Sequence, residues 1–82
     1  MPLQLKSAFA ERIHDARKGF GYTQAQVAEA VSISTRWYQQ IERGRFLPGT
    51  TVMIRLLIVL ELDPEEFREE VGLGEEIYIL RR

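Results

Sequence analysis

The side chains best suited to chemistry lie in the segment TRWYQQIER, residues 35–43, which combines arginine with glutamine. At helical spacing, one acid-free side of this segment carries Thr35, Arg36, Gln39, Gln40 and Arg43. An arginine can pair with guanine and a glutamine with adenine, because each planar fork matches two hydrogen-bonding groups on that base edge. We therefore interpret this side as a surface that reads DNA. The alternative is a polar face that is merely solvated.

The helix that must hold this surface has recognisable ends. Ser34 is a good N-cap for it, and Gly44 is a typical stop. Another helix precedes it, since Thr23 with Gln26 three residues later forms a capping-box pattern. Two short helices joined by a tight turn form a helix-turn-helix, here at about residues 23–44. Such a motif can place its second helix in the major groove of DNA.

The opposite side of the second helix is suited to a protein interior. Tyr38 and Ile41 are the expected core anchors, and Glu42 lies at the rim of that side. Because the two caps, the turn length and the acid-free side all agree, DNA readout is favoured over a solvated polar face.

Together these features resemble the Cro- and repressor-type helix-turn-helix regulators of phages and bacteria, a family also described as lambda repressor-like or Xre-like. The resemblance covers roughly residues 13–67, and it implies an all-α, compact five-helix DNA-binding domain. The residues that carry it are Arg17, Gly21, Thr23, Gln24, Val27, Ala28, Ile33, Ser34, Ile41, Glu42, Arg43, Gly44 and Pro48, with the mostly apolar run at residues 53–62.

By position, the resemblance implies roles for individual residues. Arg17 and Glu42 match a charged pair that ties the first helix to the end of the recognition helix. Breaking such a pair from one side is costly, because the orphaned charge stays desolvated. The resemblance implies base contacts from Thr35, Arg36 and Gln40. Gln39 is expected to contact bases as well, because it shares the outward side. The resemblance also implies that Gln24 contacts a phosphate. Further contacts to the DNA backbone are expected from Thr23, Ser34, Trp37, Arg43 and Arg45.

Two positions depart from the family pattern. Ser32 stands in the turn where the family usually has glycine, which tolerates a positive φ without a Cβ clash. A serine there costs roughly 1 kcal/mol. Trp37 lies between the core side and the outward side, where small polar residues are more usual. It could contact a thymine methyl or the sugar backbone, or it could pack on the edge of the domain.

Composition narrows the classes of protein to consider. With 82 residues, 45% of them apolar, the chain can bury one modest core. It has no cysteine, which excludes disulfides and thiolate metal sites and suits a reducing cytoplasm. We expect no metal or cofactor and no membrane span, because the longest apolar run, at residues 56–60, is far too short. An enzyme is not expected, since His14 is the only histidine and no cluster of catalytic side chains is visible.

Charge is distributed unevenly along the chain. The net charge is -1. Residues 1–55 hold 8 basic and 4 acidic side chains, whereas residues 56–82 hold 3 and 8. Because phosphate attraction acts locally, within about 8–10 Å at physiological salt, the basic part can bind DNA while the acidic part faces away.

The remaining helices are expected to support the motif. A first helix at about residues 4–18 is ended by Gly19. A fifth helix has Asp63 as its N-cap and Pro64 at its first position, and it stops at Gly72. A fourth helix, capped by Thr50 or Thr51, is expected to supply most of the core from Val52, Ile54, Leu57, Ile58 and Leu60.

The last segment, EEIYILRR at residues 75–82, favours a β-strand because its centre is β-branched and aromatic. Its ends carry opposite charges, so two copies paired antiparallel about Tyr78 would place Glu75 opposite Arg81. The hypothesis is that this strand, separate from a DNA-binding domain at residues 1–74, builds a dimer. The alternative is that it folds back over its own core. The dimerisation residues would be Ile77, Tyr78, Ile79 and Leu80.

These inferences converge on a transcriptional regulator that binds double-stranded DNA. The simplest form is a homodimeric repressor on a palindromic operator, because two related domains read half-sites about 34–36 Å apart. The alternative is an antitoxin-like or protein-interaction module, with an unknown protein partner and with DNA binding as a secondary property.

Overall fold

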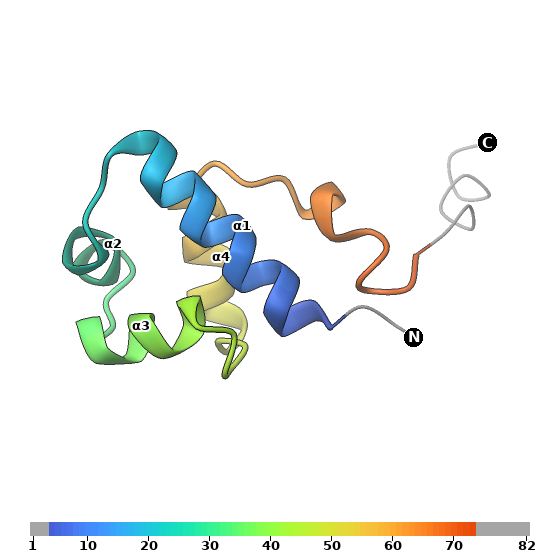
Figure 1. Ribbon diagram of the computed structural model, residues 1–82, viewed down its shortest axis with the longest axis horizontal. Coiled ribbons are helices and arrows are strands. Elements are labelled where there is room, and N and C mark those ends of the chain that lie inside the picture. Colours follow the sequence, from blue (N-terminus) through green and yellow to red (C-terminus); the bar gives the residue numbers. More distant parts are fainter. Residues whose placement is uncertain (1–3, 74–82) are drawn as a thin grey trace.

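The computed structural model describes residues 4–73, which form four α-helices and one 3-10 turn (Figure 1). No strand occurs within these residues, so the expected all-α class is confirmed for them. The expected C-terminal strand lies at residues 75–82, outside the described residues. The elements are α1 (Leu5–Phe20), α2 (Gln24–Ala30), α3 (Thr35–Glu42), α4 (Thr50–Val59) and η1 (Pro64–Phe67).

One hydrophobic core joins all of these elements. Helix α3 packs against both α2 and α1, while α4 supports α2 and the turn η1 packs on α1. Figure 1 shows α2 at one end of the long axis and the η1 segment toward the other end. The helix-turn-helix is therefore held away from the acidic end of the described chain. The buried core residues are Phe9, Ile13, Val27, Ala28, Val31, Tyr38, Ile41, Leu56, Leu60 and Phe67.

The turn between α2 and α3 is closed by a Schellman motif centred on Ser32. Its N–H bonds to the Glu29 carbonyl at 3.1 Å, and the Ile33 N–H bonds to the Ala28 carbonyl at 3.0 Å. Ser32 has φ +62°, so the serine adopts the left-handed conformation for which the family usually has glycine. Arg55 Nη1 of α4 donates a hydrogen bond to the Val31 carbonyl at 3.3 Å, which links α4 to this turn.

The strain at Ser32 gives a testable stability effect. We expect Ser32→Gly to stabilise the domain by roughly 0.5–1 kcal/mol, because relief of about 1–2 kcal/mol is partly offset by the greater freedom of glycine in the unfolded chain. Urea unfolding followed by circular dichroism measures this. Ala25→Gly, on the exposed side of α2, is the control and should destabilise by about 1 kcal/mol. Destabilisation by both variants would contradict the account.

The expected fifth helix is wrong: the segment is a 3-10 turn of four residues, η1. Its predicted start is present, since Asp63 accepts a hydrogen bond from the Glu65 N–H at 2.9 Å and Glu66 bonds back to the Asp63 N–H at 2.9 Å. However, Phe67 is the only buried residue in the turn. Such a short segment with one core anchor has too little packing to extend into a regular helix.

The other helices also differ from expectation in detail. Helix α1 continues through Gly19 and ends where Gly21 adopts φ +76°. Helix α4 begins after Gly49, and no threonine side chain caps it. The expected core face of α4 is wrong at Ile54 and Ile58, whose exposed fractions are 51% and 70%. Helix α4 instead buries Leu56, and Leu60 at its end is buried as well.

Candidate nucleic-acid interface

Helix α3 presents the expected residues outward. Its N-terminus is capped by the Ser34 hydroxyl, which accepts a hydrogen bond from the Trp37 N–H at 3.0 Å. Its inner side is anchored by Tyr38 and Ile41, which are both fully buried. Of the proposed base-contacting residues, Thr35 and Arg36 are exposed, whereas Gln39 and Gln40 are partly buried. The orientation of this side is therefore as expected, and base contact itself stays a prediction.

The Arg17–Glu42 pair is the electrostatic anchor of α3. Arg17 Nε lies 3.0 Å from Glu42 Oε2, and Arg17 Nη2 lies 2.8 Å from Glu42 Oε1, so the pairing is bidentate. The two side chains are only 10% and 6% exposed. Arg17 Nη1 also donates to the Tyr22 carbonyl at 3.0 Å, which ties the pair to the start of the motif. The pair thus joins α1, the entry to α2 and the end of α3.

Two glutamines extend this pair toward the outward side of α3. Gln24 Nε2 donates to Glu42 Oε1 at 3.2 Å, and Gln39 Nε2 donates to Gln24 Oε1 at 3.1 Å. Each carboxamide nitrogen carries a second N–H, so Gln24 can still donate to a phosphate and Gln39 to a base. The chain of bonds orients both side chains before any DNA arrives. This extension was not predicted from the sequence.

The Arg17–Glu42 pair also shifts the pKa values of both groups. The hydrogen bond to Glu42 raises the pKa of Arg17. Burial alone would raise the pKa of Glu42, but the hydrogen bonds led by that from Arg17 outweigh burial and lower it. Glu42 therefore stays ionised in the folded protein at pH values where an ordinary glutamate begins to bind its proton.

This shift predicts a loss of stability in acid. The unfolded chain protonates Glu42 near its ordinary pKa of about 4.3, whereas the folded chain does so at lower pH. Stability from this group is thus complete above that value and is lost as the pH falls through the folded pKa. Glu42→Gln should lower stability at pH 7 and flatten its decline below about pH 4.5 in urea unfolding. Glu29→Gln, at an exposed position on α2, is the matched control for removal of one carboxylate, and a wild-type profile in Glu42→Gln would contradict the assignment.

Trp37 lies on the flank of α3 and stacks on Phe46 of the α3–α4 loop. The ring centroids are 5.2 Å apart and the planes are inclined by 24°. Trp37 packs on this loop and remains 39% exposed, so its outer surface can still contact DNA. The sequence analysis did not include Phe46 in the interface. The signal that could have identified it is an aromatic residue within a basic loop. The stack borders an open hollow of about 380 Å³ that is lined by Ser34, Arg36, Trp37, Gln40, Arg45 and Phe46.

The remaining proposed backbone contacts lie at the ends of the two motif helices. Thr23 caps α2, because its hydroxyl accepts from the Gln26 N–H at 3.0 Å while Gln26 Oε1 accepts from the Thr23 N–H at 2.8 Å. Arg43 and Arg45 are exposed beyond the end of α3, on either side of Gly44. The left-handed φ of +77° at Gly44 lets the chain turn there, and Arg45 lines the same hollow as Arg36 and Gln40.

The described residues contain no group of three or more carboxylates and histidines that could hold a metal ion. None of the helices in the described part of the chain is both long and apolar enough to cross a membrane. The proposed dimerisation residues, Ile77, Tyr78, Ile79 and Leu80, lie outside the described residues.

Comparison with known proteins identifies the class. A family model described as a helix-turn-helix domain matches residues 8–69, so the chain belongs to this family. The resemblance to Cro- and repressor-type regulators is thereby confirmed at the family level. The match shows that most of the chain is a helix-turn-helix domain.

Two relatives come from phage systems. The ImmF control region 10 kDa protein of Bacillus phage phi105 is 37% identical over 51 residues, which make up 62% of this chain and 57% of that protein. The cryptic phage CTXphi transcriptional repressor RstR of Vibrio cholerae serotype O1 is 34% identical over 56 residues, which make up 68% of this chain and 50% of that protein. The chain therefore spans about half the length of these relatives. No solved structure matches the chain significantly.

Proposed function

We propose that the protein represses transcription by binding one duplex sequence, with α3 in the major groove. The observation that carries this proposal is the division of α3 into two sides. Arg36 is exposed and lines an open hollow with the partly buried Gln40, while Tyr38 is buried and the Glu42 carboxylate is held by Arg17. No carboxylate on the outward side repels phosphate. One relative is itself named as a transcriptional repressor, which favours repression over activation.

Within this proposal, base contacts and backbone contacts have different roles. Thr35, Arg36, Gln39 and Gln40 read base edges from α3. Contacts to phosphate position the helix without reading sequence. They come from both ends of the motif, through Thr23, Gln24, Ser34, Trp37, Arg43 and Arg45.

The repressor is proposed to act in the cytoplasm as a homodimer on a palindrome. A domain of this size covers too little DNA for tight specific binding, and two domains related by a two-fold axis solve that problem. The residues proposed to pair are those at 75–82, antiparallel about Tyr78. The solution mass tests this part: twice the chain mass is expected, and a mass of 9.5 kDa would contradict it.

DNA binding can be followed through Trp37, because it is the only tryptophan in the chain and lies beside Arg36. We expect its fluorescence to change when duplex DNA is added in dilute salt. The affinity should fall steeply with added salt, since each neutralised phosphate releases counterions. Trp37→Phe, with binding followed by the anisotropy of labelled DNA, controls for a signal unrelated to binding. Absence of duplex binding in dilute salt by both methods would refute the proposal.

A further inference from the structure

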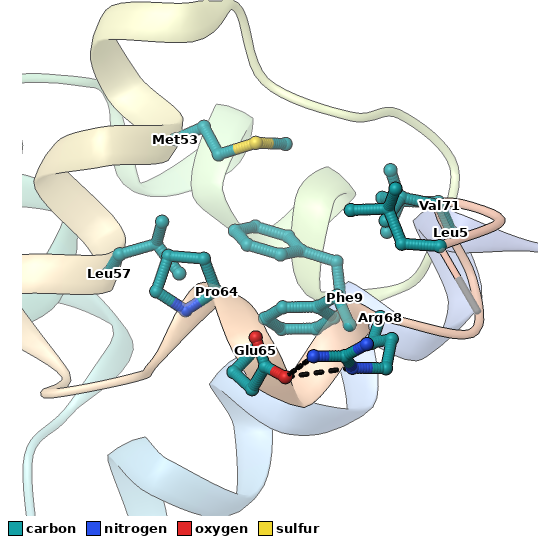
Figure 2. Close-up of a pocket in the computed structure, with 10 residues that line it drawn as sticks. Leu5, Phe9, Met53, Leu57, Pro64, Glu65, Arg68 and Val71 are labelled. Atoms are coloured by element: carbon teal, nitrogen blue, oxygen red, sulfur yellow. Dashed lines mark hydrogen bonds and ion pairs between the residues drawn. The ribbon is translucent and has the colours of Figure 1, made fainter. Parts of the chain in front are cut away.

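An apolar groove lies on the side of the domain formed by α1, α4 and η1. It encloses about 340 Å³. Figure 2 shows Phe9, Met53 and Leu57 directed into it, with Val71 on the far side and the Glu65–Arg68 ion pair at one edge. Because this ion pair satisfies the charges at the edge, the groove offers an almost wholly apolar surface to whatever covers it.

The groove opens where the described part of the chain ends. Val71 and Leu73, which line it, are both about half exposed. Residues 77–80, the apolar run IYIL, begin only four positions after Leu73. Four extended residues span at most about 13–14 Å, so the groove is within reach of the start of this run on its own chain.

The sequence of the run indicates what kind of surface it needs. Successive side chains of a strand point to opposite faces, so Ile77 and Ile79 share one face while Tyr78 and Leu80 share the other. A strand that is apolar on both faces is typical of one covered on both sides. Pairing with a second copy would give hydrogen-bond partners to the backbone groups along one edge of this strand, but it would cover neither face. A two-stranded ribbon without such support is only marginally stable in water.

We infer that the groove binds residues 77–80 of the same chain, with one face of the strand against Met53 and Leu57. The inference extends the dimer proposed above. One face of the strand would pack in the groove, while one edge of the same strand pairs with the strand of the second copy. The inference does not depend on DNA binding. It also holds in a monomer, because the groove and its occupant belong to one chain.

The chain has no cysteine, so introduced pairs can report the contact directly. Met53→Cys is combined in turn with Ile77→Cys, Tyr78→Cys and Ile79→Cys in the full chain, and each pair is oxidised gently. A disulfide forms readily only when the two Cα atoms approach within about 4.4–6.8 Å. Ile58→Cys, on the exposed side of α4, replaces Met53→Cys in the control series. Circular dichroism shows that each variant is folded, and non-reducing electrophoresis separates links within a chain from links between chains.

We expect disulfides within one chain at alternate positions. Paired with Met53→Cys, the disulfide yield of Ile77→Cys and of Ile79→Cys should differ from that of Tyr78→Cys. The higher yields should lie well above those of the Ile58→Cys series. Linkage only between chains would overturn the inference by making the second copy the occupant. Yields equal to those of the control series would also overturn it. The solution mass, measured separately, tells failure of the groove assignment from failure of the dimer: a monomer with links within the chain refutes only the dimer.

Discussion

Arg17→Ala is expected to cost about 3–5 kcal/mol of folding free energy, because it leaves the Glu42 carboxylate buried without its partner. For a domain of this size each kcal/mol lowers the Tm by about 4–8 °C, so even the lower value gives a fall of about 12 °C or more. Thermal and urea unfolding followed by circular dichroism would measure the effect. The loss should be seen without DNA, because the pair stabilises the fold and does not face the ligand.

Two controls separate this effect from simple loss of a positive charge. Lys18→Ala removes the neighbouring, exposed cation of α1 and should change stability by no more than about 0.5 kcal/mol. The double variant Arg17→Leu with Glu42→Leu should be less destabilised than the sum of the two single changes, since no orphaned charge remains. If Arg17→Ala were as harmless as Lys18→Ala, the pair would not be the anchor of α3.

Arg36→Ala is expected to relax sequence preference at one base pair of each half-site. Loss of a bidentate contact removes about 1–3 kcal/mol of discrimination, which corresponds to roughly 5- to 150-fold in relative affinity. Competition between the selected sequence and single-base variants would measure this. Binding to random DNA should weaken far less, because that binding depends on phosphate contacts.

Arg43→Ala is the matched comparison, since it removes the same charge from just beyond the end of α3. It should weaken all sequences alike and reduce the slope of affinity against salt by about one phosphate contact. If Arg36→Ala produced equal losses on the preferred sequence and on random DNA, Arg36 would be a phosphate contact and not a base contact.

The helix-turn-helix could be predicted closely because its signals are local. The caps at Thr23 and Ser34 and the stop at Gly44 each involve residues within one turn of the chain. The spacing of Tyr38 and Ile41 then determines which side of α3 is buried. The resemblance marked Ser32 as the turn position that usually holds glycine, but the backbone angle of a serine there could not be predicted.

The face of α4 could not be predicted in the same way. Its segment TTVMIRLLIV has apolar residues on every side, so periodicity does not distinguish Leu56 from Ile54 or Ile58. The choice is made by packing against α2 and the rest of the core, and it leaves Ile58 largely exposed. The capping pattern at Asp63 likewise predicted a helix start correctly, but helix length depends on core contacts that a cap does not supply.

Residues of the candidate site could be proposed one by one from the sequence, but the contacts between them could not. The bond from Gln39 to Gln24 joins residues 15 positions apart, and that from Arg17 to Glu42 joins residues 25 apart. The resemblance to a family supplied the second pair and not the first. The stack of Trp37 on Phe46 also depends on how the α3–α4 loop returns, which neither residue shows by itself.

Selection of bound duplexes from a random DNA pool tests the central claim most directly. We expect enrichment of one sequence with two-fold symmetry and with half-site centres about 34–36 Å apart, one turn of the double helix. When the selection is repeated with Arg36→Ala, preference should be lost at one position in each half. Recovery of sequences no different from the starting pool, by a folded wild-type protein in dilute salt, would contradict the claim that α3 reads DNA.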